Sequence, residues 1–141
     1  MRQMSRDEWH EFVSAGTRTG KLATVRADGR PHVVPVWFVR DGEDLVFTTW
    51  HTSVKAANLR RDPRAALCVE DDEPPYSFVM IEGSVRLDEG TDALRDWATR
   101  IATRYLGAEL GQTYGARNGV DGELLVRLTA ERVTAQANIA D

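Results

Sequence analysis

The sequence is poor in the residues on which disulfide, metal and protein-nucleophile chemistry depend. Its 141 residues include one cysteine, Cys68, which excludes an intramolecular disulfide. The three histidines are too scattered for the spacing of a zinc site, so we expect no metal. Neither a Gly-x-Ser-x-Gly elbow nor a Walker loop occurs. These absences give little support to hydrolysis, and they leave the catalytic residues unknown.

Long apolar runs and excess positive charge are also missing. No apolar stretch approaches the ~20 residues of a membrane span, and the first residues lack the apolar segment of a signal peptide. A net charge of −4 argues against a general nucleic-acid surface. We therefore expect one domain, residues 1–141, in the cytoplasm, with a small-molecule partner and without nucleic acid or membrane.

Asp-Gly pairs at two places in the first half predict tight hairpins between strands. The strands expected around them are residues 21–27, 31–40 and 45–50. Pro35 cannot donate a hydrogen bond to a neighbouring strand, so the second strand is an edge or is bulged there. Free backbone groups at this point could serve a ligand or could belong to a mere edge strand, and the residues leave both open.

The remaining elements are read from hydrophobic periodicity. It predicts helices over residues 6–14, 53–61 and 91–106, and strands over residues 64–70, 76–87 and 124–135, with a bulge at Gly83. Residues 107–122 contain several glycines and no periodicity, which predicts a mobile loop or lid. The fold class is therefore mainly β (α+β): a six- to seven-stranded antiparallel barrel with peripheral helices.

The segment 53–64 carries the most specific signal for function. Ser53 or Thr52 can cap a helix here, and the N–H groups and dipole of a helix start attract phosphate. The chain has sixteen arginines but only two lysines, and Lys55 lies in the first turn of this helix. Asn58 follows at i+3 on the same face. The pattern predicts a seat for a phosphorylated ligand, and a solvated basic helix is the open alternative.

Hydroxyl and aromatic residues surround this segment in the sequence. Thr48 and Thr49 end the preceding strand, while Trp37, Trp50, Tyr76 and Phe78 supply flat apolar surfaces. A phosphate seat beside aromatic walls suits a planar phosphorylated cofactor such as a flavin, although core packing would explain each aromatic separately. Such a cofactor carries its own redox chemistry, which would account for the lack of an acid–base set.

Nearly the whole chain resembles the pyridoxamine-5'-phosphate-oxidase-like (FMN-binding) split-barrel superfamily. The most specific motif is Lys-x-x-Asn-Leu-x-x-Asp-Pro-Arg, which begins at Lys55. An Arg-Pro-x-x-x-x-Val-Trp-Phe strand ending at Phe38 is similar to the short branch that binds the deazaflavin coenzyme F420. Ser53 stands where several relatives have a basic residue, which lowers the local positive charge.

The resemblance implies a homodimer with coenzyme sites at the subunit interface, and it assigns residues to each part of the coenzyme. Ser53, Lys55 and Asn58 would hold the phosphate. Thr48 and Thr49 would line the ring or tail, and the acidic tail would meet Arg60 and Arg61. The remaining assignments are the strand beneath the ring and a segment from the partner subunit: Val34, Pro35, Val36 and Trp37; Tyr76, Ser77 and Phe78.

The function implied is an F420-dependent reductase that transfers a hydride to a small electron-poor organic acceptor. The same phosphate seat would also accept FMN, so an FMN-binding oxidoreductase is the first alternative. A non-catalytic protein that binds a coenzyme or haem is the second alternative, because the sequence identifies no catalytic acid.

Overall fold

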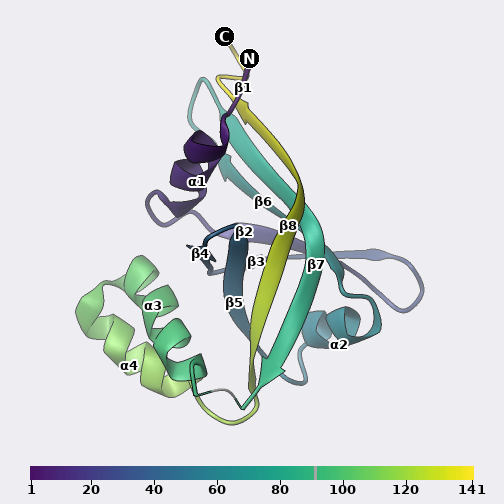
Figure 1. Ribbon diagram of the computed structural model, residues 1–141, viewed down its shortest axis with the longest axis vertical. Helices are drawn as coiled ribbons and strands as arrows, with labels where there is room; N and C mark the ends of the chain where they lie inside the picture. Colours follow the sequence, from purple (N-terminus) through teal and green to yellow (C-terminus); the bar gives the residue numbers. More distant parts are fainter. Residues whose placement is uncertain (91) are drawn as a thin grey trace.

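A single antiparallel sheet and four helices make up the computed structural model, which describes residues 1–90 and 92–141 (Figure 1). The strands are β1 (Arg2–Gln3), β2 (Gly20–Val25), β3 (Pro31–Val36), β4 (Val39–Asp41), β5 (Asp44–Trp50), β6 (Arg64–Asp71), β7 (Ser77–Glu89) and β8 (Glu123–Ala137). The helices are α1 (Arg6–Ser14), α2 (Val54–Arg61), α3 (Leu94–Leu106) and α4 (Ala108–Asn118).

The order of the strands explains why the sheet rolls up. It runs β3-β2-β6-β7-β8-β5-β4, with β1 paired to β8. The outermost strands, β3 and β4, follow each other in the chain and are joined only by Trp37 and Phe38. Such a short link requires the two ends of the sheet to lie close together. The antiparallel split-barrel prediction is confirmed, and the eight strands include the two-residue β1 and the three-residue β4.

Two strand predictions meet different outcomes at this corner. The strand predicted over residues 31–40 is divided, because the chain turns at Trp37–Phe38 from one end of the sheet to the other. The prediction of an edge at Pro35 is confirmed, since β3 is the last strand in the sheet order, next to β2, and Pro35 lies opposite Lys21. The missing N–H of Pro35 is therefore tolerated at the sheet border.

The bulge predicted at Gly83 is present as a register shift between Glu82 and Gly83, where β7 pairs with β8. A Cβ atom at Gly83 would lie 1.8 Å from the Thr129 carbonyl oxygen. Only glycine allows the two strands to approach this closely, and the bulge bends the long β7–β8 pair around the barrel.

The loop predicted over residues 107–122 is wrong, because most of this segment forms helix α4. Gly107, with φ of 92°, separates α3 from α4, and the two helices pack as a hairpin. Gly111 and Gly115 are four residues apart, so they lie on one helix face, against α3. A Cβ at Gly115 would lie 2.0 Å from Thr99 Oγ1. The glycines therefore provide close helix contact, where the sequence analysis took them for flexibility.

The barrel interior holds the main hydrophobic core, in which the largest fully buried side chains include Phe38, Phe47, Leu22 and Leu67. A second cluster, Val46, Leu94 and Leu125, joins the outer face of β5 and β8 to α3. The α3–α4 hairpin thus covers one side of the barrel (Figure 1). None of the helices described is long and apolar enough to cross a bilayer.

Candidate functional site

A cavity of about 320 Å³ lies beside the seam of the barrel, where β3, β5 and α2 meet the α3–α4 hairpin. Its lining residues are Pro35, Val36, Trp37, Thr48, Lys55, Ala98, Ile101, Ala102, Asn118 and Glu123. Five of the residues predicted to contact a coenzyme therefore line one cavity: Pro35, Val36, Trp37, Thr48 and Lys55. The cavity combines an aromatic wall, a hydroxyl group and an ammonium group.

Lys55 is the only cationic residue that lines this cavity among the residues described. It follows Val54 in the first turn of α2, where the helix dipole also favours an anion. Within the described part of the chain no carboxylate forms an ion pair with Lys55, whereas the other lysine, Lys21, lies 3.9 Å from Glu70. An ammonium group at a helix start, facing a cavity, is a donor set that fits a phosphate group.

The hydroxyl groups of Thr49 and Ser53 are hydrogen-bonded to each other at 2.7 Å, beside this cavity. Ser53 Oγ also accepts a hydrogen bond from the Ala56 N–H, which makes Ser53 the N-cap of α2. Successive residues of a strand point to opposite faces, so Thr48 lines the cavity while Thr49 is buried. The predicted contacts of Ser53 and Thr49 with a coenzyme stay predictions.

Asn58 lies on the buried face of α2. Its Nδ2 donates to Thr24 Oγ1 at 3.0 Å, and its Oδ1 accepts from Arg61 at 3.2 Å. Only 4% of the residue is exposed. The amide therefore attaches α2 to β2, and its predicted contact with phosphate stays a prediction.

Arg60 and Arg61 are not among the residues that line the cavity. Arg60 donates to the His51 carbonyl at 2.8 Å and to Glu89 at 3.1 Å. Arg61 donates to the Val25 carbonyl as well as to Asn58. Both guanidinium groups thus have protein partners, and their predicted contact with a coenzyme tail stays a prediction.

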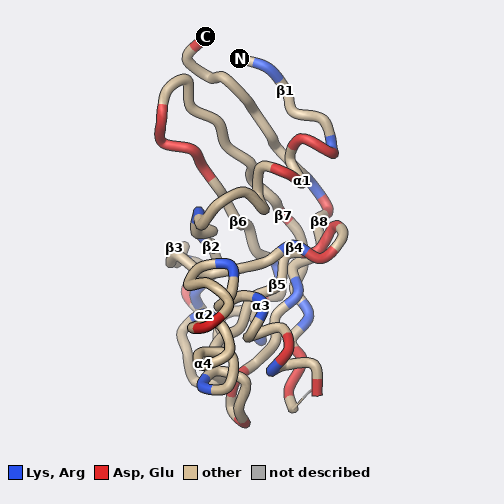
Figure 2. Tube along the Cα trace, turned by 90° about the vertical axis from the view of Figure 1, so that its left-hand side faces the viewer, with Lys and Arg blue, Asp and Glu red and all other residues tan. Residues whose placement is uncertain are grey.

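The predicted segment 76–78 lies at the far end of the long strands from Lys55. Phe78 pairs with Gln136, near the end of β8, whereas the cavity residue Glu123 is at the beginning of that strand. The 15 residues of β8 correspond to about 45 Å. This end of the sheet, with the acidic β6–β7 turn, is beside the termini and far from α2 (Figures 1 and 2). Within one chain, Tyr76, Ser77 and Phe78 cannot join the cavity.

Val34 differs from its neighbours on β3. Its half-buried side chain packs against the barrel core, and it is not among the residues that line the cavity. The edge of the cavity is formed instead by the seam residues that follow it. Val34 beneath a coenzyme ring stays a prediction.

Trp37 is fixed by a stacking contact with Tyr105 of α3. The ring centroids are 5.1 Å apart and the ring planes differ by 7°. Tyr105 donates through its hydroxyl to the Arg18 carbonyl at 2.9 Å and accepts from the Phe38 N–H at 3.3 Å. The orientation of the indole at the seam is therefore set by α3, a connection that strand periodicity could not predict.

Glu123 is a cavity residue that sequence reasoning missed. On β8 it lies two residues before Leu125, which is opposite Thr48, so Glu123 and Thr48 share a face of the sheet. Burial raises the pKa of Glu123, while a hydrogen bond from Thr48 and the charge of Lys55 act in the opposite direction. No motif marks this carboxylate, because its proximity to Lys55 depends on the β5–β8 register.

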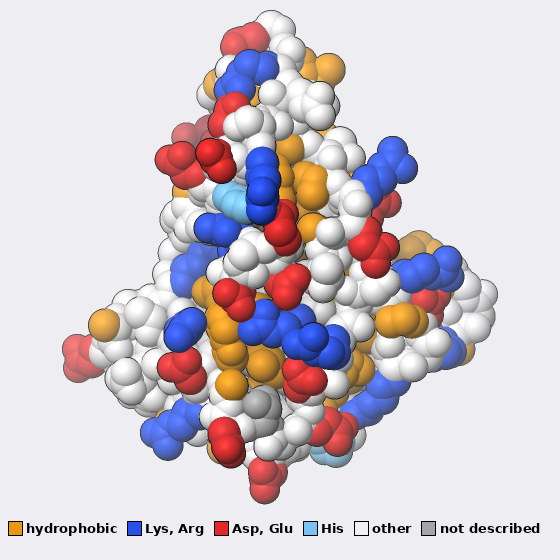
Figure 3. Space-filling view, in the orientation of Figure 1, with side chains coloured by type: hydrophobic (Ala, Val, Ile, Leu, Met, Phe, Trp, Pro, Cys, Tyr) orange, Lys and Arg blue, Asp and Glu red, His pale blue; other side chains and the backbone are white. Residues whose placement is uncertain are grey.

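A larger hollow, of about 500 Å³, is lined by residues of β2, β3, β6, β7 and β8 and shares no lining residue with the seam cavity. It is lined by alanine, valine and proline together with two arginines and two glutamates: Arg64, Arg132, Glu82 and Glu131. Charged side chains of both signs are intermixed on the molecular face shown in Figure 3. In the described part of the chain no group of histidine, cysteine and acidic residues could hold a metal ion. The smaller cavity at the seam is therefore the candidate site.

The rolled antiparallel sheet, whose first and last strands are joined by a two-residue link, is a split barrel. The sequence agrees with this assignment, since the family described as pyridoxamine 5'-phosphate oxidase matches residues 5–137. The chain belongs to this family.

Three relatives define the region of the family in which the chain lies. An F420H(2)-dependent biliverdin reductase of Mycobacterium tuberculosis is 36% identical over 86 residues, which are 60% of this chain and 61% of that protein. A conserved hypothetical protein of Mycobacterium tuberculosis has a crystal structure with a TM-score of 0.84 and 30% identity, covering 98% of this chain and 91% of its own. A solved F420 reductase gives a TM-score of 0.70 and 28% identity, covering 88% and 94%.

These relatives confirm the predicted superfamily and the predicted likeness to its F420-dependent branch. Of these three relatives, the two with a named activity are reductases. The match to the biliverdin reductase spans about three fifths of that protein's length.

Proposed function

We propose that this protein is an F420-dependent oxidoreductase that reduces a small electron-poor organic molecule. The observation that carries the proposal is the position of the Lys55 ammonium group, in one cavity with the indole of Trp37. The likeness to an F420-dependent reductase and to a solved F420 reductase supports F420 over other coenzymes.

Different residues of the cavity would contact different parts of the coenzyme. Lys55 and the first turn of α2 neutralise the phosphate of the coenzyme. Trp37, Pro35 and Val36 would offer an apolar surface to its ring, and the α3 residues Ala98, Ile101 and Ala102, which line the same cavity, would help to exclude water. The bound deazaflavin would supply the hydride, so the protein's contribution is to orient the ring and to shield it.

A homodimer forms part of the proposal because the segment 76–78 lies at the far end of the same chain. Tyr76 is 43% exposed there, which is a large aromatic surface facing solvent. A second copy could bring this segment to the seam cavity and complete the wall around the coenzyme. A C2 dimer would do this for both copies at once.

Titration of the apo protein with F420 and with FMN, followed by fluorescence, tests the choice of coenzyme. We expect tight binding of F420, and turnover of reduced F420 with at least one member of a panel of enones, quinones and tetrapyrroles. Tight binding of FMN without binding of F420 would overturn the proposal in favour of an FMN oxidoreductase. Binding of F420 without turnover of any acceptor would indicate a coenzyme-binding protein that is not an enzyme.

A further inference from the structure

The phosphate seat contains a carboxylate as well as an ammonium group. Glu123 is half-buried and lines the same cavity as Lys55 and Thr48. Both of these groups favour the ionised carboxyl and lower its pKa, Thr48 as a hydrogen-bond donor and Lys55 through its charge. These are the polar groups that the seat would offer to an anionic coenzyme, so the carboxylate and the coenzyme's phosphate compete for them.

The fold holds Glu123 in this position from several sides. Its backbone is in the β5–β8 pairing, opposite Trp50. Gly122, directly before it, has φ of 98°, and a Cβ there would lie 2.5 Å from the Trp50 ring. The close packing of Trp50 on the turn fixes the beginning of β8. The backbone of Glu123 is therefore held in place beside the cavity by the sheet.

Several other ionisable residues lie near Glu123. A second cavity, of about 360 Å³, lies on its other side and is lined by His51, Glu89 and Asp121, with Glu123 itself. Arg60 spans the His51 carbonyl and Glu89. From α3 and α4 the coenzyme cavity receives only uncharged residues: Ala98, Ile101, Ala102 and Asn118. Lys55 is thus the one cation that shares the coenzyme cavity with Glu123 among the described residues.

We propose that Glu123 acts as a resident counterion of the phosphate seat, and that it takes up one proton from solvent when an anionic coenzyme binds to Lys55. This inference rests on the proposed function and identifies how the seat is regulated. An arriving phosphate would bring a like charge beside a carboxylate that is already partly desolvated. Protonation removes that repulsion and leaves Lys55 and the Thr48 hydroxyl to the coenzyme.

The pH dependence follows from linkage. Between the pKa of Glu123 in the free protein and its higher pKa in the complex, binding takes up a proton, so affinity falls as pH rises, by up to tenfold per pH unit. Below the first pKa the proton is already present, and above the second none is taken up, so the dependence disappears at both ends. Burial, the main influence on Glu123, raises its pKa and brings the change closer to neutral pH.

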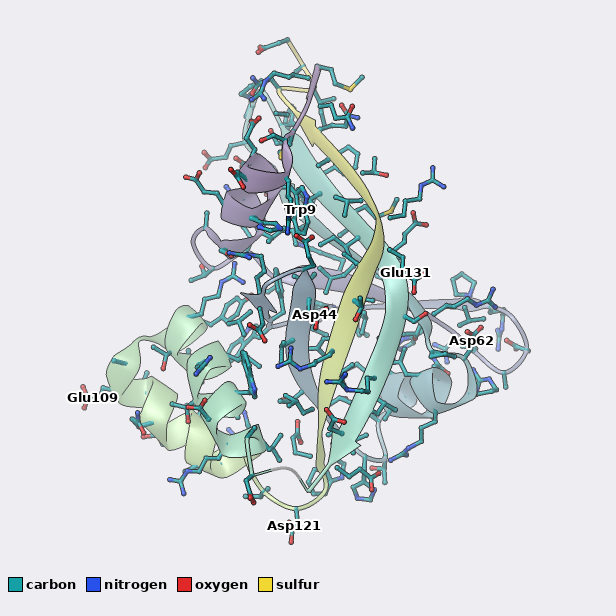
Figure 4. All side chains as sticks on the ribbon, viewed as in Figure 1. Trp9, Asp44, Asp62, Glu109, Asp121 and Glu131 are labelled. Atoms are coloured by element: carbon teal, nitrogen blue, oxygen red, sulfur yellow. The ribbon has the colours of Figure 1, made fainter. Side chains whose placement is uncertain are left out.

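Calorimetric titration with F420 tests the inference in the full-length protein, Glu123→Gln and Asp121→Asn. The glutamine keeps an acceptor for Thr48 and removes the charge. Asp121 is a matched control, because it is two residues away, does not line the coenzyme cavity and points outward from the turn before β8 (Figure 4). Titrations in two buffers of different ionisation enthalpy count the protons taken up.

We expect Glu123→Gln to bind F420 roughly five- to tenfold more tightly than the wild type at about pH 8. It should lose proton uptake and the fall in affinity with pH, whereas Asp121→Asn should retain both. The difference between wild type and variant cancels any ionisation of the coenzyme itself. A thermal unfolding scan checks that each variant is folded.

The outcomes separate this inference from the proposed function. If F420 binds and Lys55→Ala weakens binding, but Glu123→Gln changes neither affinity nor proton uptake, the role of Glu123 is overturned and the function stands. If FMN binds and F420 does not, the choice of F420 is overturned. The comparison of the wild type with Glu123→Gln, repeated with FMN, then tests the role of Glu123. If neither coenzyme binds, both proposals are overturned.

Discussion

The indole of Trp37 and the phenol of Tyr105 lie nearly parallel, with their centroids 5.1 Å apart, and so connect the seam of the barrel to helix α3. The seam joins the two ends of the sheet, while α3 belongs to the hairpin that covers the cavity. The Tyr105 hydroxyl also forms hydrogen bonds with the backbone at two places: it donates to the Arg18 carbonyl and accepts from the Phe38 N–H. One side chain therefore fixes both the wall of the site and its cover.

Tyr105→Phe and Tyr105→Leu separate these two roles. The phenylalanine keeps the stack and loses the hydroxyl, so we expect a loss of about 1 kcal/mol in the free energy of unfolding and little change in coenzyme affinity. The leucine also loses the stack, at about 0.5–1.5 kcal/mol more. Without the Tyr105 ring to hold its indole in place, Trp37 should bind the coenzyme ring less well. Chemical denaturation and coenzyme titration measure the two effects, and equal affinities in both variants would contradict the role of the stack.

Lys55→Ala should weaken coenzyme binding by about 1.5–3 kcal/mol, because a charge-assisted hydrogen bond to phosphate is lost. The other lysine offers a matched control, since Lys21 pairs with Glu70 on β6 and does not line the cavity. Lys21→Ala should leave the dissociation constant unchanged. Equal effects of the two substitutions would show that overall charge, and not the seat, determines affinity.

Asn58→Ala should lower the free energy of unfolding by about 1–3 kcal/mol, because Thr24 would keep a buried hydroxyl without its partner. Removing both partners, in Asn58→Leu with Thr24→Val, should cost less than the sum of the two single changes. The affinity of the folded variants for F420 then tests the sequence-based prediction that Asn58 contacts the phosphate. A loss like that of Lys55→Ala would place Asn58 at the phosphate, whereas unchanged affinity would limit it to holding α2.

Gly115→Ala should destabilise the α3–α4 hairpin by about 1–3 kcal/mol, because its Cβ would overlap Thr99 at a packed interface. In an exposed helix position the same substitution stabilises by up to about 1 kcal/mol. Gln112→Ala, at an exposed position of the same helix, is the control and should be nearly neutral. Hydrogen exchange of α3 and α4 would report the loosening directly, and an unchanged exchange rate in Gly115→Ala would contradict the packing argument.

The fold was largely predictable because local signals and tertiary structure agree. The two Asp-Gly turns and the bulge at Gly83 each have a steric or hydrogen-bonding cause that involves few residues. The glycine-rich segment 107–122 was wrongly predicted as a loop, because its local signal does not point to a single structure. Flexibility and close helix packing both require glycine, and only the contact with α3 distinguishes them.

The candidate site was predictable as far as its residues lie on consecutive elements. Lys55, Thr48 and the end of β3 follow from a strand, a turn and a helix start within about two dozen residues. Glu123 on β8 and Tyr105 on α3 are distant from these elements in the sequence, and their positions depend on strand register and helix docking. No periodicity carries that information.

The two-residue link between β3 and β4 has a consequence for any attempt to alter this protein. The joint that closes the barrel is also a border of the proposed binding cavity, so its width sets the circumference of the scaffold and the room for a ligand together. Substitutions that tighten the joint to gain heat resistance will reshape the pocket, and substitutions that enlarge the pocket will loosen the closure.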